Sequence, residues 1–419
     1  MNRIYQVWPI SWIEPQYKGD NRSALRKVVD FVPRFARLGV KYLWLSPIFT
    51  SPWSDHGYDV ADFTEIDLRF GTLKEFEQLI VVANCHGIGI LLDLVLNHTS
   101  TNHRWFKMQP EYYCWSKVDK PGWKNLFDGG SSWAPYKGRR YLHLFSNDQA
   151  DLNWFPEGLD KSPNLELVIK FRSIVDYWAK KGVAGFRLDA MQCINKDPSS
   201  DVFDPFATAD MEHRKLAAKV INSVFNDQRA NMFLLMECLD LSGDLVKYYY
   251  ENTPVDAVMD NTPVNTLSIT DDQSVTSRNL DDYLAAVKAA FERCPEGFAH
   301  VIESHDCPRF TTAAGVDGKT AIDILHGYYN GEQFIKPRTI VIYQGEELGL
   351  VNPGKEELTD EMMVELDAQT KMRFQRGESL DELRATSRAN SRVAVPLVEY
   401  ERQEKDENSC LNYCLTYGT

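Results

Sequence analysis

The sequence lacks several features that would identify its partners. It has no Lys/Arg-rich block, and its formal net charge is -14 over 419 residues. Such a chain repels the phosphate backbone of nucleic acids and anionic membrane surfaces. No apolar run reaches the length of a membrane span, since even the stretch 87–96 is broken by Asp93. The sequence therefore predicts neither a nucleic-acid partner nor a membrane partner.

Cysteine and histidine patterns typical of structural sites are also missing. The eight cysteines are scattered, with no C-x-x-C pair and no neighbouring histidine pattern of a zinc site. The chain enters strand-like sequence directly after Met1, Asn2 and Arg3, which leaves no room for a signal peptide. We therefore expect reduced thiols and a cytoplasmic protein.

Strand-like and helical patterns alternate along most of the chain. Short apolar runs are separated mainly by segments with apolar residues at helical spacing, such as Leu167, Phe171 and Ile174. This alternation predicts parallel strands joined by crossover helices, in either a doubly wound open sheet or a closed barrel. The eight strand-like runs span residues 4–12, 41–45, 89–94, 185–189, 231–237, 257–260, 299–306 and 339–343.

Acidic residues mark the downstream ends of at least four of these strands, namely Asp93, Asp189, Glu237 and Asp306. In a (β/α)8 barrel the carboxyl ends of all strands converge on one face, whereas in an open sheet only those near the switch point meet. The acids therefore favour a (β/α)8 TIM barrel. The segment 99–163 lacks periodicity and is too long for an ordinary loop, so we predict barrel residues at 1–98 and 164–419 with an inserted subdomain between them.

Three of the carboxylates, Asp189, Glu237 and Asp306, suit the cleavage of a glycosidic bond. That reaction needs one acid to protonate the leaving oxygen and a carboxylate on the other side of the anomeric carbon. Arg187 can keep Asp189 ionised, although the two side chains could equally form a purely structural ion pair. A metal hydrolase is the chemical rival, but no HxH or HExxH spacing is present.

Several motifs occur in the order found in one enzyme family. They are Asp93 to His98 (DxxxNH), Gly185 to Ala190 (GFRxDA), Glu237 closing the fifth strand, and His305-Asp306, with further matches at residues 57–59, 149–153 and 344–347. Together they resemble the α-amylase family, glycoside hydrolase family 13, over nearly the whole chain. The QADLN motif at 149–153 is similar to that of the oligo-1,6-glucosidase and α-glucosidase branch.

The resemblance implies a role for each matching residue. Asp189 would be the nucleophile, Glu237 the general acid and base, and Asp306 the acid that binds sugar hydroxyls and stabilises the transition state. Ala190 resembles relatives that favour α-1,4 bonds. The residues implied to bind the substrate are Tyr58, Asp59, His98, Arg187, Ala190, His305 and Arg309.

The sequence departs from the family at three points. Residues 16–21 replace an acidic metal loop and offer too few oxygen ligands for calcium, so we expect no metal, and nothing implies a cofactor. Ser304 replaces the asparagine usual before His-Asp. The chain stops at Thr419, near the expected last barrel helix, so the C-terminal β domain of the family is predicted to be absent and the sequence could be a fragment.

The leading hypothesis is a retaining α-glucosidase that acts on short oligosaccharides or disaccharides, with α-1,4 bonds favoured over α-1,6. A transglucosylase or sugar isomerase of the same family would use the same triad and is the nearest alternative. A non-catalytic relative is a further one, but such proteins lose the carboxylates that this chain keeps. The oligomeric state stays open.

Overall fold

Eight parallel strands form a closed barrel in the computed structural model, which describes residues 1–13, 22–156, 161–197, 200–203, 211–225, 232–238, 244–260, 280–365, 367–393 and 395. The strands follow one another in chain order around the barrel, and the last pairs with the first. The predicted (β/α)8 barrel is therefore confirmed. Its strands are β1 Asn2–Val7, β2 Tyr42–Leu45, β5 Gly89–Val95, β12 Gly185–Asp189, β14 Phe233–Cys238, β15 Ala257–Asp260, β16 Phe298–Val301 and β19 Thr339–Tyr343.

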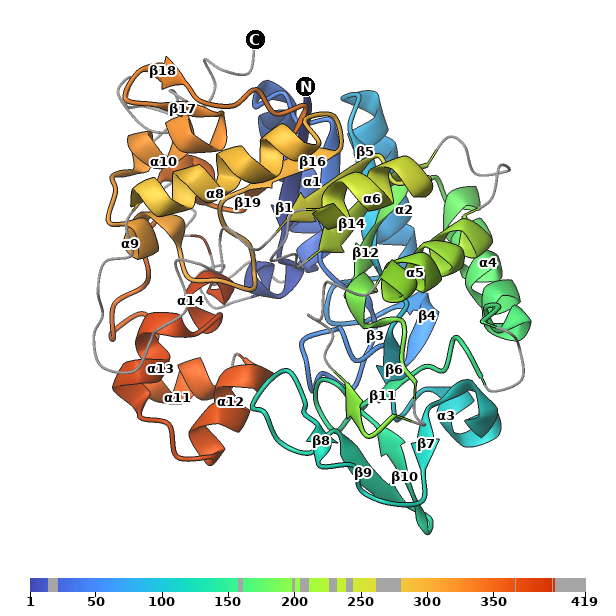
Figure 1. Ribbon diagram of the computed structural model, residues 1–419. Coiled ribbons are helices and arrows are strands. Elements are labelled where there is room, and N and C mark those ends of the chain that lie inside the picture. The colour runs from blue at the N-terminus through green and yellow to red at the C-terminus, as the bar shows by residue number, and fades with distance from the viewer. Residues whose placement is uncertain are drawn as a thin grey trace.

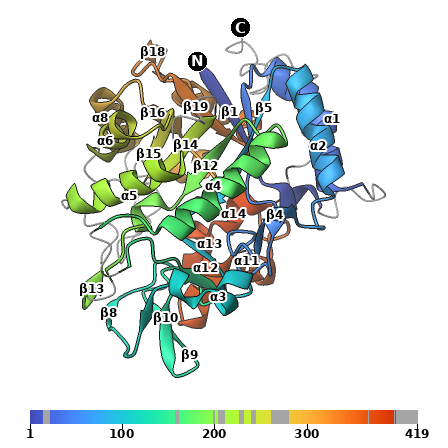
Figure 2. The same cartoon turned by 90° about the vertical axis from the view of Figure 1, so that its right-hand side faces the viewer.

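Helices with one apolar face surround these strands (Figure 1), with α1 and α2 on one side of the barrel and α5, α6 and α8 on the other (Figure 2). Helix α2 begins with a capping box, in which Thr72 accepts a bond from the Glu75 backbone and Glu75 bonds the Thr72 backbone in return. Helices α1 and α4 are capped by Ser23 and Asn164. The bounds are α1 Ala24–Arg37, α2 Leu73–Cys85, α4 Leu165–Lys180, α5 Met211–Val224, α6 Asp244–Asn252, α8 Leu280–Arg293, α9 Phe310–Ala314 and α10 Gly318–Leu325.

Two of the barrel strands end earlier than their sequence patterns predict. β1 stops at Val7, because Pro9 lacks the N–H that a continued ladder needs, and a short 3-10 helix covers Pro9–Trp12. β16 stops at Val301, so Asp306 lies in the following loop. In that loop the Asp306 backbone N–H donates to the Ser304 hydroxyl.

Small sheets rich in aromatic residues follow the third barrel strand. β6 (His98–Ser100) leaves the barrel and pairs with β11 (Gln149–Asp151), so this part of the chain departs and returns at neighbouring points. We propose that it is the inserted subdomain expected at residues 99–163. Its other elements are α3 Arg104–Met108, β7 Trp115–Ser116, β8 Gly122–Trp123, β9 Trp133–Tyr136 and β10 Arg139–Leu142.

In the described part of the chain, four short α-helices follow the last barrel strand and lie beside the inserted sheets (Figure 1). They are α11 Asp360–Glu365, α12 Ala368–Gln375, α13 Leu380–Thr386 and α14 Ala389–Arg392. An ion pair of 2.6 Å between Arg376 and Asp128 joins the two regions. The last barrel helix was expected near the end of the chain, and residues 396–419 lie outside the described residues. No helix in the described part of the chain is long and apolar enough to cross a membrane.

Candidate active site

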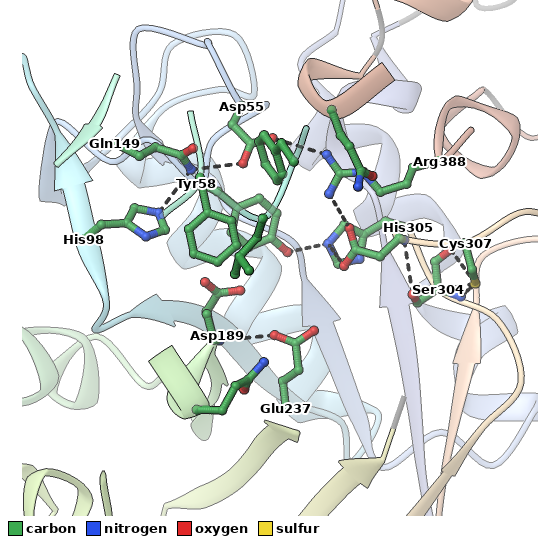
Figure 3. Close-up of a pocket in the computed structure, with 17 residues that line it drawn as sticks. Asp55, Tyr58, His98, Gln149, Asp189, Glu237, Ser304, His305, Cys307 and Arg388 are labelled. Carbon is green, nitrogen blue, oxygen red and sulfur yellow. Dashed lines mark hydrogen bonds and ion pairs between the residues drawn. The ribbon is translucent and has the colours of Figure 1, made fainter. Parts of the chain in front are cut away.

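A pocket of about 210 Å³ opens at the downstream ends of the barrel strands (Figure 3). This volume is below the range of roughly 300–1,000 Å³ found for drug-sized ligands, so the pocket suits a ligand part about as large as one sugar ring. Its lining residues are Asp55, Tyr58, His98, Leu126, Phe127, Phe145, Gln149, Asp189, Ala190, Gln192, Glu237, Ser304, His305, Asp306, Cys307, Gln369 and Arg388.

The Arg187 guanidinium is the centre of a buried group of carboxylates. It contacts Asp93 at 2.7 Å, Glu237 at 2.8 Å, and the carboxylate of Asp189. Asp189 is the last residue of β12 and Glu237 is near the end of β14, and these two strands are paired. The Ala190 backbone N–H also donates to Glu237 at 3.1 Å. One cation thus fixes both candidate catalytic carboxylates at one side of the pocket.

These acids outnumber the cation that they share. Burial raises the pKa of Asp189 well above its usual range; Glu237 and Asp93 act in the same direction, while Arg187 opposes them. Burial also raises the pKa of Asp93 to about 6. Arg187 thus favours the ionised form of Asp189, as the sequence suggested, but burial and the neighbouring acids outweigh it. Carboxyl groups that interact this closely titrate as a coupled set.

Two neutral histidines line the same pocket. Burial holds the pKa of His305 well below its usual range and lowers that of His98 to about 4. His305 Nδ1 lies 2.8 Å from the side-chain amide of Gln6. Nε2 lies 2.6 Å from the Tyr58 hydroxyl. His98 Nε2 is 3.1 Å from the Gln149 amide.

Arginines surround the third candidate acid, Asp306. Its carboxylate lies 3.0 Å from Arg388 and 3.3 Å from Arg392. Burial raises the pKa of Asp306, but His305, 3.1 Å away, and the guanidiniums of Arg388 and Arg392 together outweigh it and hold the pKa below the usual range. The fully buried Asp367 contacts both arginines, at 2.5 and 3.6 Å, and so anchors them. Asp306 is therefore held as a charged group at the pocket surface.

One end of the pocket is closed by Asp55 and Arg388. Asp55 is 4% exposed, accepts a bond of 3.0 Å from Gln149 and lies 3.7 Å from the Arg388 guanidinium. The same guanidinium lies 5.0 Å from the centre of the Phe127 ring. Burial raises the pKa of Asp55 to about 7 despite the two nearby arginines. These contacts join the barrel, the inserted sheets and the last helices into one wall.

Comparison with known proteins identifies the family of this chain. The family described as alpha amylase, catalytic domain, matches residues 6–395. The chain belongs to this family. Trehalose-6-phosphate hydrolase of Escherichia coli strain K12 is 31% identical, over 94% of this chain and 74% of that protein. Glucan 1,6-alpha-glucosidase of Streptococcus pneumoniae serotype 4 is 28% identical over the same shares.

A solved structure has a similar fold over the whole chain. Trehalose-6-phosphate hydrolase from Bacillus licheniformis superposes with a TM-score of 0.80 at 25% identity, covering 100% of this chain and 82% of that one. The α-amylase fold thus extends over the full matched length.

Most residues that the family motifs single out meet in the pocket. Asp189, Glu237, Asp306, Tyr58, His98, Ala190 and His305 line it, and Arg187 lies directly behind its carboxylates. Asp59 does not line it; this fully buried carboxylate accepts bonds from Ser51 and Ser54. Arg309 also lies away from the pocket, where it bonds Glu303 at 3.0 Å and the Gln344 carbonyl oxygen at 2.9 Å. Both residues support loops instead.

Several lining residues were not predicted, above all Asp55 and Arg388. Asp55 lies four residues before Asp59 in the same short loop, so its charge could have marked it as a candidate site residue. The sequence does not show in which direction its side chain faces. Arg388 comes from the turn between α13 and α14, where no strand pattern marks a site. Residues 16–21, which the sequence suggests cannot hold calcium, lie outside the described residues.

Proposed function

We propose that the protein is a retaining α-glucosidase that releases the terminal glucose of short α-glucosides. The observation that carries this proposal is the pair Asp189 and Glu237, both bound to the Arg187 guanidinium inside a pocket closed at one end. Two carboxylates held by one planar group are close neighbours. Such closeness favours the retaining geometry, in which about 5–5.5 Å separates them, over the wider inverting one.

In the first step Asp189 attacks the anomeric carbon as the glycosidic C–O bond breaks, and Glu237 gives its proton to the leaving oxygen. In the second step Glu237 takes a proton from water, whose oxygen replaces Asp189 on that carbon. Asp306, kept charged by Arg388 and Arg392, accepts hydrogen bonds from the sugar hydroxyls.

The closed end supports release of one terminal glucose rather than cleavage inside a longer chain. Asp55, Arg388 and Phe127 contact one another at this end and bound the pocket there. Among the described lining residues Arg388 is the only lysine or arginine, and acids already engage it, so the lining favours an uncharged substrate. The relatives' names include 1,6-glucosidases, while Ala190 favours α-1,4 bonds; we propose α-1,4 as preferred and α-1,6 as possible.

One assay panel tests the proposal. Maltose, isomaltose, sucrose, trehalose and trehalose 6-phosphate are offered in parallel to the wild type and to Asp189→Asn. We expect glucose release to be fastest from maltose, and a loss of several orders of magnitude in the variant because the covalent step is removed. Equal activity of the two proteins would overturn the role of Asp189, and a preference for the phosphorylated sugar would overturn the substrate class.

Transfer of glucose to a second sugar is the alternative that one observation favours. Leu126 and Phe145 make part of the pocket lining apolar, which suits a sugar ring as acceptor better than free water. Products that accumulate as longer or isomeric sugars at high maltose concentration, in place of free glucose, would favour this alternative.

A further inference from the structure

A cavity of about 260 Å³ lies on the hairpin of β9 and β10, in the inserted sheets. Figures 1 and 2 show this hairpin at the lower edge of the molecule, where it projects away from the barrel. Four of the seven residues that line the cavity are cationic, namely Lys117, Lys137, Arg139 and Arg140, and none is acidic. None of the seven lines the catalytic pocket.

This concentration of positive charge occurs in an acidic chain. Residues 117–140 contain six of the 46 lysines and arginines but only two of the 60 acidic residues. Within the described residues, none of the four cavity cations forms an ion pair with an acid. Lys181 and Arg338, which are also at the surface, pair with Glu77 and Glu296. The charges around the cavity are therefore available to an anion from solution.

The pairing of the strands brings two of these cations together. β10 pairs with β7 in an antiparallel register that sets Arg140 opposite Ser116. Continued by one residue, this register sets Arg139 opposite Lys117. Like charges directly opposite each other on neighbouring strands are destabilising. An anion bound between the two side chains would replace this repulsion by attraction.

Both arginines of the cavity are already held in place. The Arg139 guanidinium lies 3.5 Å from the centre of the Trp115 ring, a stacking contact that leaves its N–H groups free to donate. Arg140 donates one N–H to the Trp133 carbonyl oxygen at 2.8 Å. Because these side chains lose little further freedom when a ligand arrives, the entropic cost of binding is reduced. A guanidinium also presents parallel N–H donors that match two oxygens of a phosphate group.

The turn of the hairpin supplies a further cation in a backbone conformation that disfavours it. Lys137 and Gly138 connect Tyr136 to Arg139, with φ of 48° and 81°. A two-residue turn with positive φ at both positions prefers asparagine, aspartate or glycine at the first of them. Lysine there carries the strain of a left-handed backbone, which is a feature that recurs at ligand sites. The turn thus places a positive charge at the cavity where an uncharged or acidic residue would fit the backbone better.

We propose that this cavity binds the phosphate group of a small molecule, either inorganic phosphate or a phosphate ester. A phosphate ester carries about 1.5 to 2 negative charges at pH 7, which the four unpaired cations match better than the single charge of a carboxylate. The cavity is close in volume to the catalytic pocket, so the ligand is small. The site is independent of the proposed function, because the two cavities share no residue.

The test titrates the full chain with inorganic phosphate and, separately, with glucose 6-phosphate. Calorimetry measures the affinity, and the indole N–H signal of Trp115, assigned with Trp115→Phe, locates the ligand in ¹H–¹⁵N NMR spectra. Potassium chloride at matched ionic strength measures the response to salt alone. The site variant combines Lys137→Gln with Arg139→Gln. The charge-matched control combines Lys124→Gln with Arg104→Gln, at two exposed positions between β5 and β12 that do not line the cavity. Circular dichroism verifies that each variant folds.

We expect phosphate to shift the Trp115 signal of the wild type, with an affinity at least tenfold weaker in the site variant and within about twofold of the wild type in the control. Tighter binding of glucose 6-phosphate identifies an ester as the ligand and tighter binding of inorganic phosphate identifies the free anion; either result supports the site. Equal weakening in both double variants overturns the proposal, because overall charge then governs binding. A Trp115 signal that does not respond, or that responds equally to potassium chloride, also overturns it.

Discussion

Replacing Arg187 by glutamine removes the cation that contacts Asp93, Asp189 and Glu237 together. Because the positive charge favours the ionised forms of Asp93 and Asp189, its loss raises the pKa values of these two groups. The nucleophile must be deprotonated to react. The acid limb of the activity profile, where the rate increases with pH, should therefore move to higher pH in Arg187→Gln.

The size of this effect follows from the contact distances. Two unit charges about 4 Å apart attract by about 4 kcal/mol at an effective dielectric constant near 20. One pH unit corresponds to 1.36 kcal/mol, so even a third of that attraction moves the acid limb by about one unit. Loss of one partner from a buried ion pair also costs roughly 3–5 kcal/mol of stability. Folding of the variant must therefore be verified by circular dichroism at each assay temperature.

The assay is kcat/KM for maltose between pH 4 and 8. Arg309→Gln is the matched control, because Arg309 is as buried as Arg187 but pairs with Glu303 outside the pocket. We expect a displaced acid limb in Arg187→Gln and an unchanged one in Arg309→Gln. A drop in kcat/KM that is uniform over this pH range, with the limb in its wild-type position, would refute the reasoning.

Three further changes have definite expected outcomes. Burial raises the folded-state pKa of Asp55 from about 4 to about 7, so this group lowers the free energy of unfolding as pH rises through that range. In urea unfolding, the stability of Asp55→Asn should therefore fall by roughly 2–4 kcal/mol less than that of the wild type over the same pH range. Ala190 has φ 47° and ψ 38°, so the β-branched Ala190→Val should lose about 1–3 kcal/mol in calorimetry, whereas Ala190→Gly should not. Trp44 donates to Asp93 at 2.7 Å, and Trp44→Phe should cost about 1–3 kcal/mol in urea unfolding by leaving a buried carboxylate oxygen without its donor. An unchanged unfolding midpoint in Ala190→Val or in Trp44→Phe would contradict the prediction for that variant.

The barrel and the acids on its strands could be read from the sequence because their signals are local and periodic. An apolar run followed by a charged residue identifies a buried strand and the end that faces a site, as in 185–189. Asp306 was associated with the right strand although β16 ends five residues earlier, because the loop that carries it begins at the same end of the barrel.

The closed end of the pocket could not be read in this way. Asp55 and Asp59 occupy one irregular loop in which His56 and Gly57 both have positive φ, so the chain turns and the two acids face different surroundings. No periodic pattern records such a turn. Arg388 reaches the pocket by packing of short helices far along the chain, and its partners Asp55, Asp306 and Asp367 come from three separate segments. Only tertiary contacts bring them together.

The most direct test of the central claim is the anomeric form of the first glucose released from maltose, followed by proton NMR before mutarotation. Two carboxylates bound to one guanidinium imply a double displacement, so α-glucose should appear first and convert slowly to the β form. Initial release of β-glucose would show a single displacement by water and would contradict the assignment of Asp189 as the nucleophile.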